Sequence, residues 1–266
     1  MKQLRRTQYM THALLAAFVL APFALAHATN TLNITYFTIA ETDQDANHLA
    51  GGLYTNEVMN TLGTNGFPIL NTTTYGCTSG CYAIAGAPKD VLSDGEITYW
   101  SPTLNNGVVP GGTSDVTETG TGTVPIPYTN NSFYPPNGGG TSDYNGFQSA
   151  ILYGTIDAPT TENIGFSIGS DDMAFLYMDA TLQCSDGGVH GNSSVPCTTS
   201  TISAGDHSIE LFFVDINNVD AALDFSINTT GITTSGATPE PGTFGLLGSG
   251  LLALAGLVRR KIGHRV

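Results

Sequence analysis

The sequence predicts an all-β protein in which residues 29–230 form a single antiparallel β-barrel or β-sandwich domain. Short runs in which apolar and polar residues alternate recur through this region, as in strands with one buried face. Residues typical of turns, mainly glycine, threonine, serine and asparagine, separate these runs. Many short strands joined by turns are typical of sandwiches and barrels, and the length suits one domain rather than two.

Seven runs are predicted as strands, and only residues 53–62 are predicted as a short helix. The predicted strands are residues 32–37, 97–100, 150–153, 164–168, 174–178, 208–214 and 223–227. Residues 103–148 are rich in glycine and proline and are predicted to form a long surface loop. The aromatic side chains of this loop either stack on sugars or anchor the loop to the core; they are Tyr128, Phe133, Tyr134 and Tyr144.

Residues 1–28 are predicted to be a secretory signal peptide. Lys2, Arg5 and Arg6 give it a basic start, an apolar stretch follows, and Ala26-His27-Ala28 offers a small-x-small cleavage site. A twin-arginine signal is disfavoured because Thr7-Gln8 stands where apolar residues are expected. A membrane-retained first helix is disfavoured because the apolar stretch is short.

The C-terminal end has three parts in a fixed order. Pro239, Glu240 and Pro241 close a linker (231–241), and residues 242–266 contain an almost uncharged apolar stretch followed by Arg259-Arg260-Lys261. This tail resembles a PEP-CTERM sorting signal, with Pro-Glu-Pro as the recognition element. The resemblance implies a helix held transiently in the inner membrane of a Gram-negative bacterium, a cytoplasmic basic cluster and processing by an exosortase-type enzyme. The alternative is a plain membrane anchor. Either one places the domain outside the cytoplasm, and the resemblance implies the cell surface or the extracellular matrix.

The charge of the exported part excludes several kinds of partner. Residues 29–237 contain 21 acidic residues and one basic residue, Lys89, for a net charge of −20. Such a surface repels phosphate backbones and anionic lipids, so we expect no nucleic-acid binding and membrane contact only through the C-terminal helix. The carboxylates have almost no basic partners, and they must therefore be solvated or bind cations.

All four cysteines lie in the exported part, as expected for an oxidising compartment. We predict sequential disulfides, Cys77 with Cys81 and Cys184 with Cys197, among three connectivities. Because His190 is close in sequence to Cys184 and Cys197, a zinc site is the alternative, but the cysteine spacings do not match a zinc framework.

Two adjacent acidic residues, Asp171 and Asp172, lie where one predicted strand ends and the next begins. Neighbouring side chains in an extended chain point to opposite faces, so these two converge only if the backbone is kinked or the peptide bond is cis. Two converging carboxylates repel each other unless a hard divalent cation, calcium above all, lies between them. The alternative is a solvated acidic turn.

The sequence around this pair resembles the fibro-slime domain. The shared pattern is an apolar strand, Asp171-Asp172, a second apolar strand, and Asp186-Gly187-Gly188-Val189-His190, which lacks one spacer residue of the family's tail. Fibro-slime domains are related to the protective-antigen-type β-barrel of yeast flocculins and glycosidase accessory modules. The resemblance is best over residues 164–227. It implies calcium held by the paired aspartates with sugar hydroxyls completing its shell, and Asp215 followed by Asn217 as further calcium ligands.

The predicted function is therefore that of an exported, calcium-dependent, lectin-like module that binds an extracellular polysaccharide or a cell-surface glycan. The ligand-binding residues are predicted to be Asp171, Asp172, His190, Asn218 and Asp220, although residues 217–220 also read as an ordinary polar turn. The chain has no nucleophile elbow, zinc-protease motif or phosphate loop, and we expect no enzymatic activity. The alternatives are a structural protein of a matrix, sheath or fibre, in which calcium only rigidifies loops, and an extracellular glycan-processing enzyme.

Overall fold

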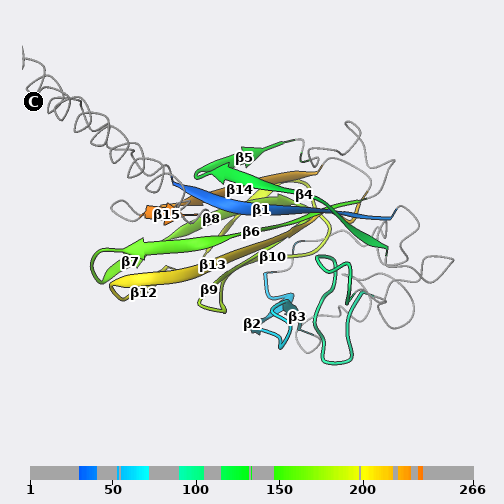
Figure 1. Ribbon diagram of the computed structural model, residues 1–266, viewed down its shortest axis with the longest axis horizontal. Coiled ribbons are helices and arrows are strands. Elements are labelled where there is room, and N and C mark those ends of the chain that lie inside the picture. The colour runs from blue at the N-terminus through cyan, green and yellow to red at the C-terminus, as the bar shows by residue number, and fades with distance from the viewer. Residues whose placement is uncertain are drawn as a thin grey trace, which may run out of the picture.

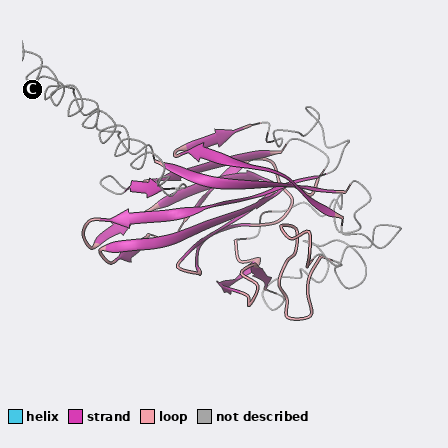
Figure 2. Ribbon diagram, in the orientation of Figure 1, coloured by secondary structure: helices cyan, strands magenta, loops and turns pink. Residues whose placement is uncertain are grey.

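The computed structural model describes residues 30–40, 53, 55–71, 90–104, 115–131, 133, 147–197, 199–217, 221–228 and 233–235. Within these ranges every regular element is a β-strand, which confirms the predicted all-β class (Figure 2). No helix in the described ranges is long and apolar enough to cross a membrane. The predicted signal peptide (1–28), the predicted sorting helix (242–266) and the cysteines Cys77 and Cys81 lie outside the described residues.

Nine of the described strands form one large antiparallel sheet. Its order is β3-β2-β10-β9-β13-β6-β1-β4, with β15 also paired to β6. These strands are β1 (Thr31–Ile39), β2 (Val58–Leu62), β3 (Pro68–Leu70), β4 (Val116–Pro125), β6 (Phe147–Ala158), β9 (Met173–Met178), β10 (Thr181–Asp186), β13 (Gly205–Val214) and β15 (Thr233–Ser235). The long strands β6 and β13 pair from Ala158 opposite Gly205 to Ser149 opposite Val214, and they lie at the centre of the sheet.

Two smaller sheets complete the described structure. One has the order β11-β8-β14-β5, and the other pairs β12 with β7. Their strands are β5 (Tyr128–Asn130), β7 (Glu162–Ile164), β8 (Phe166–Asp171), β11 (Ser193–Pro196), β12 (Ser200–Ile202) and β14 (Ala222–Ile227). In Figure 1, β5 and β14 lie above the central strands of the large sheet, and β2 and β3, at one edge of that sheet, lie below its central strands. The described strands thus form layered open sheets and no closed barrel, so the sandwich is the better of the two predicted architectures.

The central strands of the large sheet are buried on both faces. Along β13, Ile209, Leu211 and Phe213 belong to the core that includes β8 and β14, whereas Phe212 and Val214 belong to a second core on the opposite face. Strand β9 is divided in the same way and is buried along its whole length. Strands covered on both faces read as continuous apolar runs, which explains the sequence of β9 and of the end of β13.

The second core is covered by the β2–β3 hairpin and by residues 90–104. The prediction of a helix over residues 53–62 is wrong, because Val58–Leu62 is strand β2, in which only Val58 is fully buried. The prediction of a strand over residues 97–100 is also wrong. This segment forms turns and isolated bridges, and its apolar residues are buried by packing, with the Trp100 ring 5.1 Å from that of Phe212.

The predicted loop over residues 103–148 contains two strands, β4 and β5, which corrects the prediction. Strand β4 pairs with β1 and is rich in threonine and glycine, so its sequence carries little apolar signal. The side chain of Phe133 is fully buried, with its ring 4.6 Å from that of Phe213, and it therefore anchors this part of the chain to the core. Tyr134 and Tyr144 lie outside the described residues.

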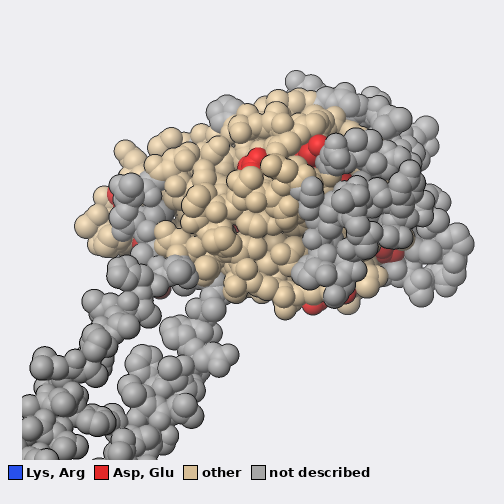
Figure 3. Space-filling view, turned by 90° about the horizontal axis from the view of Figure 1, so that it is seen from above, with Lys and Arg blue, Asp and Glu red and all other residues tan. Residues whose placement is uncertain are grey.

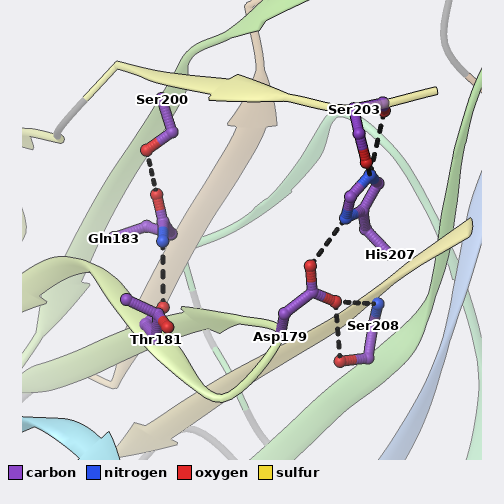
Figure 4. A network of polar contacts seen from close by, with 7 residues as sticks. All are labelled: Asp179, Thr181, Gln183, Ser200, Ser203, His207 and Ser208. Carbon is purple, nitrogen blue, oxygen red and sulfur yellow. Dashed lines mark hydrogen bonds and ion pairs between the residues drawn. The ribbon is translucent and has the colours of Figure 1, made fainter. Parts of the chain in front are cut away.

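A polar network joins the turn between β9 and β10 to the start of β13 (Figure 4). Asp179, in this turn, has a positive φ of 49° and accepts hydrogen bonds from the Ser208 N–H at 2.9 Å and from Nδ1 of His207 at 2.6 Å. Nε2 of His207 lies 3.0 Å from the carbonyl oxygen of Ser203. The imidazole thus clamps this turn to the loop that precedes β13.

Candidate metal centre

Three aspartates from two segments of the chain converge at one end of the sheets. Asp171 ends β8, Asp172 precedes β9 and Asp215 follows β13. The peptide bond between Asp171 and Asp172 is cis. One carboxylate oxygen from each residue lies within 4.8 Å of the others, and all three side chains are buried. The two neighbouring carboxylates therefore converge on one site rather than pointing to opposite faces.

Backbone N–H groups from two different loops hold the carboxylate of Asp172. The His190 N–H donates to Oδ1 at 3.2 Å, and the Ile216 N–H donates to Oδ2 at 3.0 Å. The Asn217 N–H donates to Oδ1 of Asp215 at 3.1 Å. A carboxylate offers about four lone-pair positions, so each of these groups keeps acceptor capacity for a further ligand.

The surroundings of the three carboxylates are poor in positive charge. The described residues contain no lysine or arginine, and among them only His190 and His207 can carry a positive side-chain charge. Figure 3 shows acidic side chains in small red groups on an otherwise uncharged described surface. Burial raises the pKa of Asp172, and the hydrogen bonds from the backbone of Ile216 and His190 oppose this rise. A bound cation would compensate the charge of the cluster.

The arrangement fits a hard cation of the size of calcium. Calcium binds oxygen ligands at 2.3–2.6 Å, so two ligand oxygens on opposite sides of the ion are about 5 Å apart. The three carboxylate oxygens lie within 4.8 Å of one another, so one cation of this size can contact all of them.

The other predicted site residues have different places. Asn217 follows Asp215 and contributes its main-chain N–H to that carboxylate, whereas Asn218 and Asp220 lie outside the described residues. The imidazole of His190 contacts Gly191 and Asp186, whereas the main-chain N–H of His190 contacts Asp172. Its Nδ1 is 3.0 Å from the Gly191 carbonyl oxygen, and its Nε2 is 3.1 Å from Oδ1 of Asp186.

Two acidic residues beside the centre were not among the predicted site residues. Asp186, at the end of β10, is fully buried and accepts hydrogen bonds from Ser170. Glu57 is also fully buried, and burial raises its pKa to about 8 in spite of the nearby Gly188 N–H and His190. The Asp-Gly-Gly-Val-His pattern contained a signal for Asp186. Glu57 had none, because it precedes a strand that is remote in sequence.

A disulfide joins Cys184 of β10 to Cys197. The bridged segment contains Asp186, the glycine turn and His190, so the covalent loop includes the residues that approach Asp172 from one side. Gly188 has a φ of 88°, a conformation that favours glycine and turns the chain back toward His190. Cys77 and Cys81 lie outside the described residues, so their pairing stays a prediction.

The comparisons with known proteins identify the C-terminal segment. Residues 237–261 match the model of the PEP-CTERM protein-sorting motif, and this range includes Pro239, Glu240 and Pro241. This motif implies export in a Gram-negative bacterium, a membrane-anchoring C-terminal signal and processing by an exosortase. A comparison with curated protein sequences gives no match.

Several solved structures of adhesin-type β domains are similar to this chain, at low identity. The PA14 sugar-binding domain from an RTX adhesin is 12% identical, with 79% of this chain and 93% of that chain covered and a TM-score of 0.33. The epithelial adhesin 6 A domain of Candida glabrata, in complex with Galβ1-3GlcNAc, is 13% identical, with 82% and 92% covered and a TM-score of 0.35. The PA14 domain of the MpAFP antifreeze protein is 18% identical, with 35% and 55% covered and a TM-score of 0.31.

Proposed function

We propose that this chain is an exported carbohydrate-binding module of the fibro-slime type that uses calcium at Asp171, Asp172 and Asp215. It acts as a lectin-like adhesin on extracellular polysaccharide or cell-surface glycan, at the cell surface or in the extracellular matrix. The PEP-CTERM motif supports the location outside the cytoplasm. We assign binding and no catalysis to the site.

The observation that carries the proposal is the convergence of three buried carboxylates within 4.8 Å of one another. Buried charges are costly unless they are paired or bind a metal, and a divalent cation is the partner that we propose for this cluster. Calcium binds carboxylate oxygens and completes its six to eight ligands with carbonyls, waters or hydroxyls. Vicinal hydroxyls of a sugar are ligands of that kind, so a cation held here links the acidic chain to a neutral glycan.

A second function is supported by the depth of the three carboxylates. Asp172 and Asp215 are 0% exposed and Asp171 is 8% exposed. A cation at this depth could serve only to tie the loops after β8 and β13 together. The chain would then be a structural protein of a matrix, sheath or fibre, with no sugar at the cation.

Calcium titration by calorimetry on the purified full-length chain tests the metal part of the proposal. We expect saturable binding by the wild type, loss of binding in Asp171→Asn/Asp172→Asn, and wild-type affinity in Asp157→Asn. Asp157 is an exposed carboxylate at the opposite end of β6, so this control removes an acidic charge without touching the site. Equally weak binding by all three proteins would mean diffuse attraction to an acidic surface, and the proposal would be refuted.

The glycan part requires a second measurement on the same proteins. We expect binding to immobilised polysaccharides or a glycan array that requires calcium, stops in EDTA and is absent from the double variant. Saturable calcium binding without any glycan binding, together with calcium-dependent self-association, would reject the lectin function in favour of the structural one.

A further inference from the structure

Asp186 lies close to the junction of β8 and β9, which carries the candidate metal ligands Asp171 and Asp172. It is the last residue of β10, where it pairs with Ala174 of β9, and its side chain is 0% exposed. Its carboxylate contacts both chain segments that hold Asp172, one through Ser170 and the other through His190.

The first contact runs through Ser170, two residues before Asp172. Oδ2 of Asp186 accepts hydrogen bonds from the Ser170 N–H at 3.0 Å and from its hydroxyl at 2.8 Å. The same hydroxyl lies 2.8 Å from the carbonyl oxygen of Asp172 and can donate to it instead. Ser170 is fully buried, so this main-chain connection is shielded from water.

The second contact runs through His190, whose ring is 3.1 Å from Oδ1 of Asp186 at Nε2. Nδ1 of the ring lies 3.0 Å from the Gly191 carbonyl oxygen. The contact of Nε2 with Asp186 is an ion pair when the ring is protonated. The main chain of His190 then donates its N–H to Oδ1 of Asp172 at 3.2 Å. Because the contact with Asp186 holds the ring of His190 in place, it also holds the main-chain N–H of His190, which orients the carboxylate of Asp172.

We propose that Asp186 is the positioning residue of the metal centre, because it holds Ser170 and His190 on either side of Asp172 and so keeps that carboxylate aimed at the cation. The inference rests on the proposed calcium function. Without a cation the three carboxylates repel one another, and the hydrogen bonds on Asp172 must resist that repulsion. Outer-shell partners of metal ligands have this orienting effect in other metal sites.

The test uses full-length Asp186→Asn, with Asp157→Asn as the matched control for the loss of one carboxylate. The amide group retains an oxygen for Ser170 but loses the charge that pairs with His190. We expect the calcium dissociation constant, measured by calorimetry, to rise about 10- to 100-fold, the range typical for outer-shell changes, while the control stays at the wild-type value.

A second readout, taken in EDTA, separates positioning from calcium binding itself. Hydrogen exchange of the His190 amide reports its bond to Asp172, and we expect faster exchange in Asp186→Asn. The Ile216 amide donates to the other oxygen of Asp172 from a different loop, after β13, and its exchange is therefore expected to change less. If Asp186→Asn fails to fold, Ser170→Ala and His190→Gln each remove one of the two contacts, and the same two measurements apply.

The outcomes are distinct. Faster His190 exchange together with weaker calcium binding supports the inference. Unchanged exchange, or a calcium affinity within twofold of the control, overturns it even if the wild type binds calcium. A wild type without saturable calcium binding overturns the proposed function, and the exchange data then still decide whether Asp186 orders Asp172.

Discussion

Removal of the disulfide between Cys184 and Cys197 tests the account of how the loop beside the metal centre is held. The two cysteines are 13 residues apart in sequence, and chain-entropy models give about 3 kcal/mol of stabilisation for a closed loop of this size. We therefore expect Cys184→Ala/Cys197→Ala to lower the free energy of unfolding by about 3 kcal/mol. For a domain of this size that corresponds to a fall in Tm of roughly 6–12 °C.

The assay is urea unfolding of the full-length chain in EDTA, followed by fluorescence. Trp100 is the single tryptophan, its side chain is 2% exposed, and its indole N–H donates to the Phe213 carbonyl oxygen at 2.7 Å. Unfolding moves this indole from the core into water, so its emission reports the global transition. EDTA removes any contribution from cation binding.

The control is the same pair of titrations with a reducing agent. Reduction should bring the wild type to the stability of the variant, because the two proteins then differ only by the sulfur atoms of buried Cys184 and partly buried Cys197. A difference below about 0.5 kcal/mol under oxidising conditions would refute the loop-closure reasoning. It would also mean that non-covalent contacts alone, such as those of Asp186 with Ser170, hold this segment in place.

Two further predictions concern the pH dependence of stability and the core. The hydrogen bond to Asp179 raises the pKa of His207. The stabilisation of the folded state by the protonated imidazole is therefore complete below the ordinary pKa of about 6.5, and it is lost as the pH rises through the raised pKa. In urea unfolding, His207→Gln should thus be less stable than the wild type at pH 6, with a gap that narrows toward alkaline pH; a gap independent of pH would contradict this. Phe133→Ala should lower the free energy of unfolding by about 3–5 kcal/mol because the ring is fully buried. The control Tyr153→Ala, at an exposed side chain, should lower it by about 0.5 kcal/mol or less. Equal losses in the two variants would show that burial is not the cause.

Much of the fold could be predicted because the central strands carry their own signal. The apolar runs of β9, β13 and β14 are buried on one or both faces, and their residues follow the period-2 pattern closely. The prediction failed where burial came from a neighbour remote in sequence. Residues 53–62 were predicted as a short helix, whereas Val58–Leu62 is a strand because it pairs with β10 and β3.

Strand β4 was missed for a different reason. Its threonines and glycines pair with β1 along almost its whole length, but most of its side chains are partly or fully exposed and few are apolar. The sequence of such an edge strand resembles that of a polar loop.

At the candidate site, the sequence by itself determined the chemistry. The adjacent aspartates, the acidic excess and the near absence of basic residues made a cation the natural partner, and the alternation of the flanking strands placed Asp171 and Asp172 at a junction between strands. Asp215 was predicted only through a family resemblance, and the structure brings it to the pair because β9 and β13 are neighbours that pair at Met173 and Val214.

The tertiary structure alone decided which groups support the centre. Glu57, just before β2, and Asp186, at the end of β10, are separate from the aspartate pair in sequence, and their burial depends on how the sheets stack. The partners of His190 were likewise not readable from its sequence neighbours, since its ring contacts Asp186 while its N–H contacts Asp172. Residue types follow from the chain, but distances between side chains from different strands are set by register and packing, which no local pattern specifies.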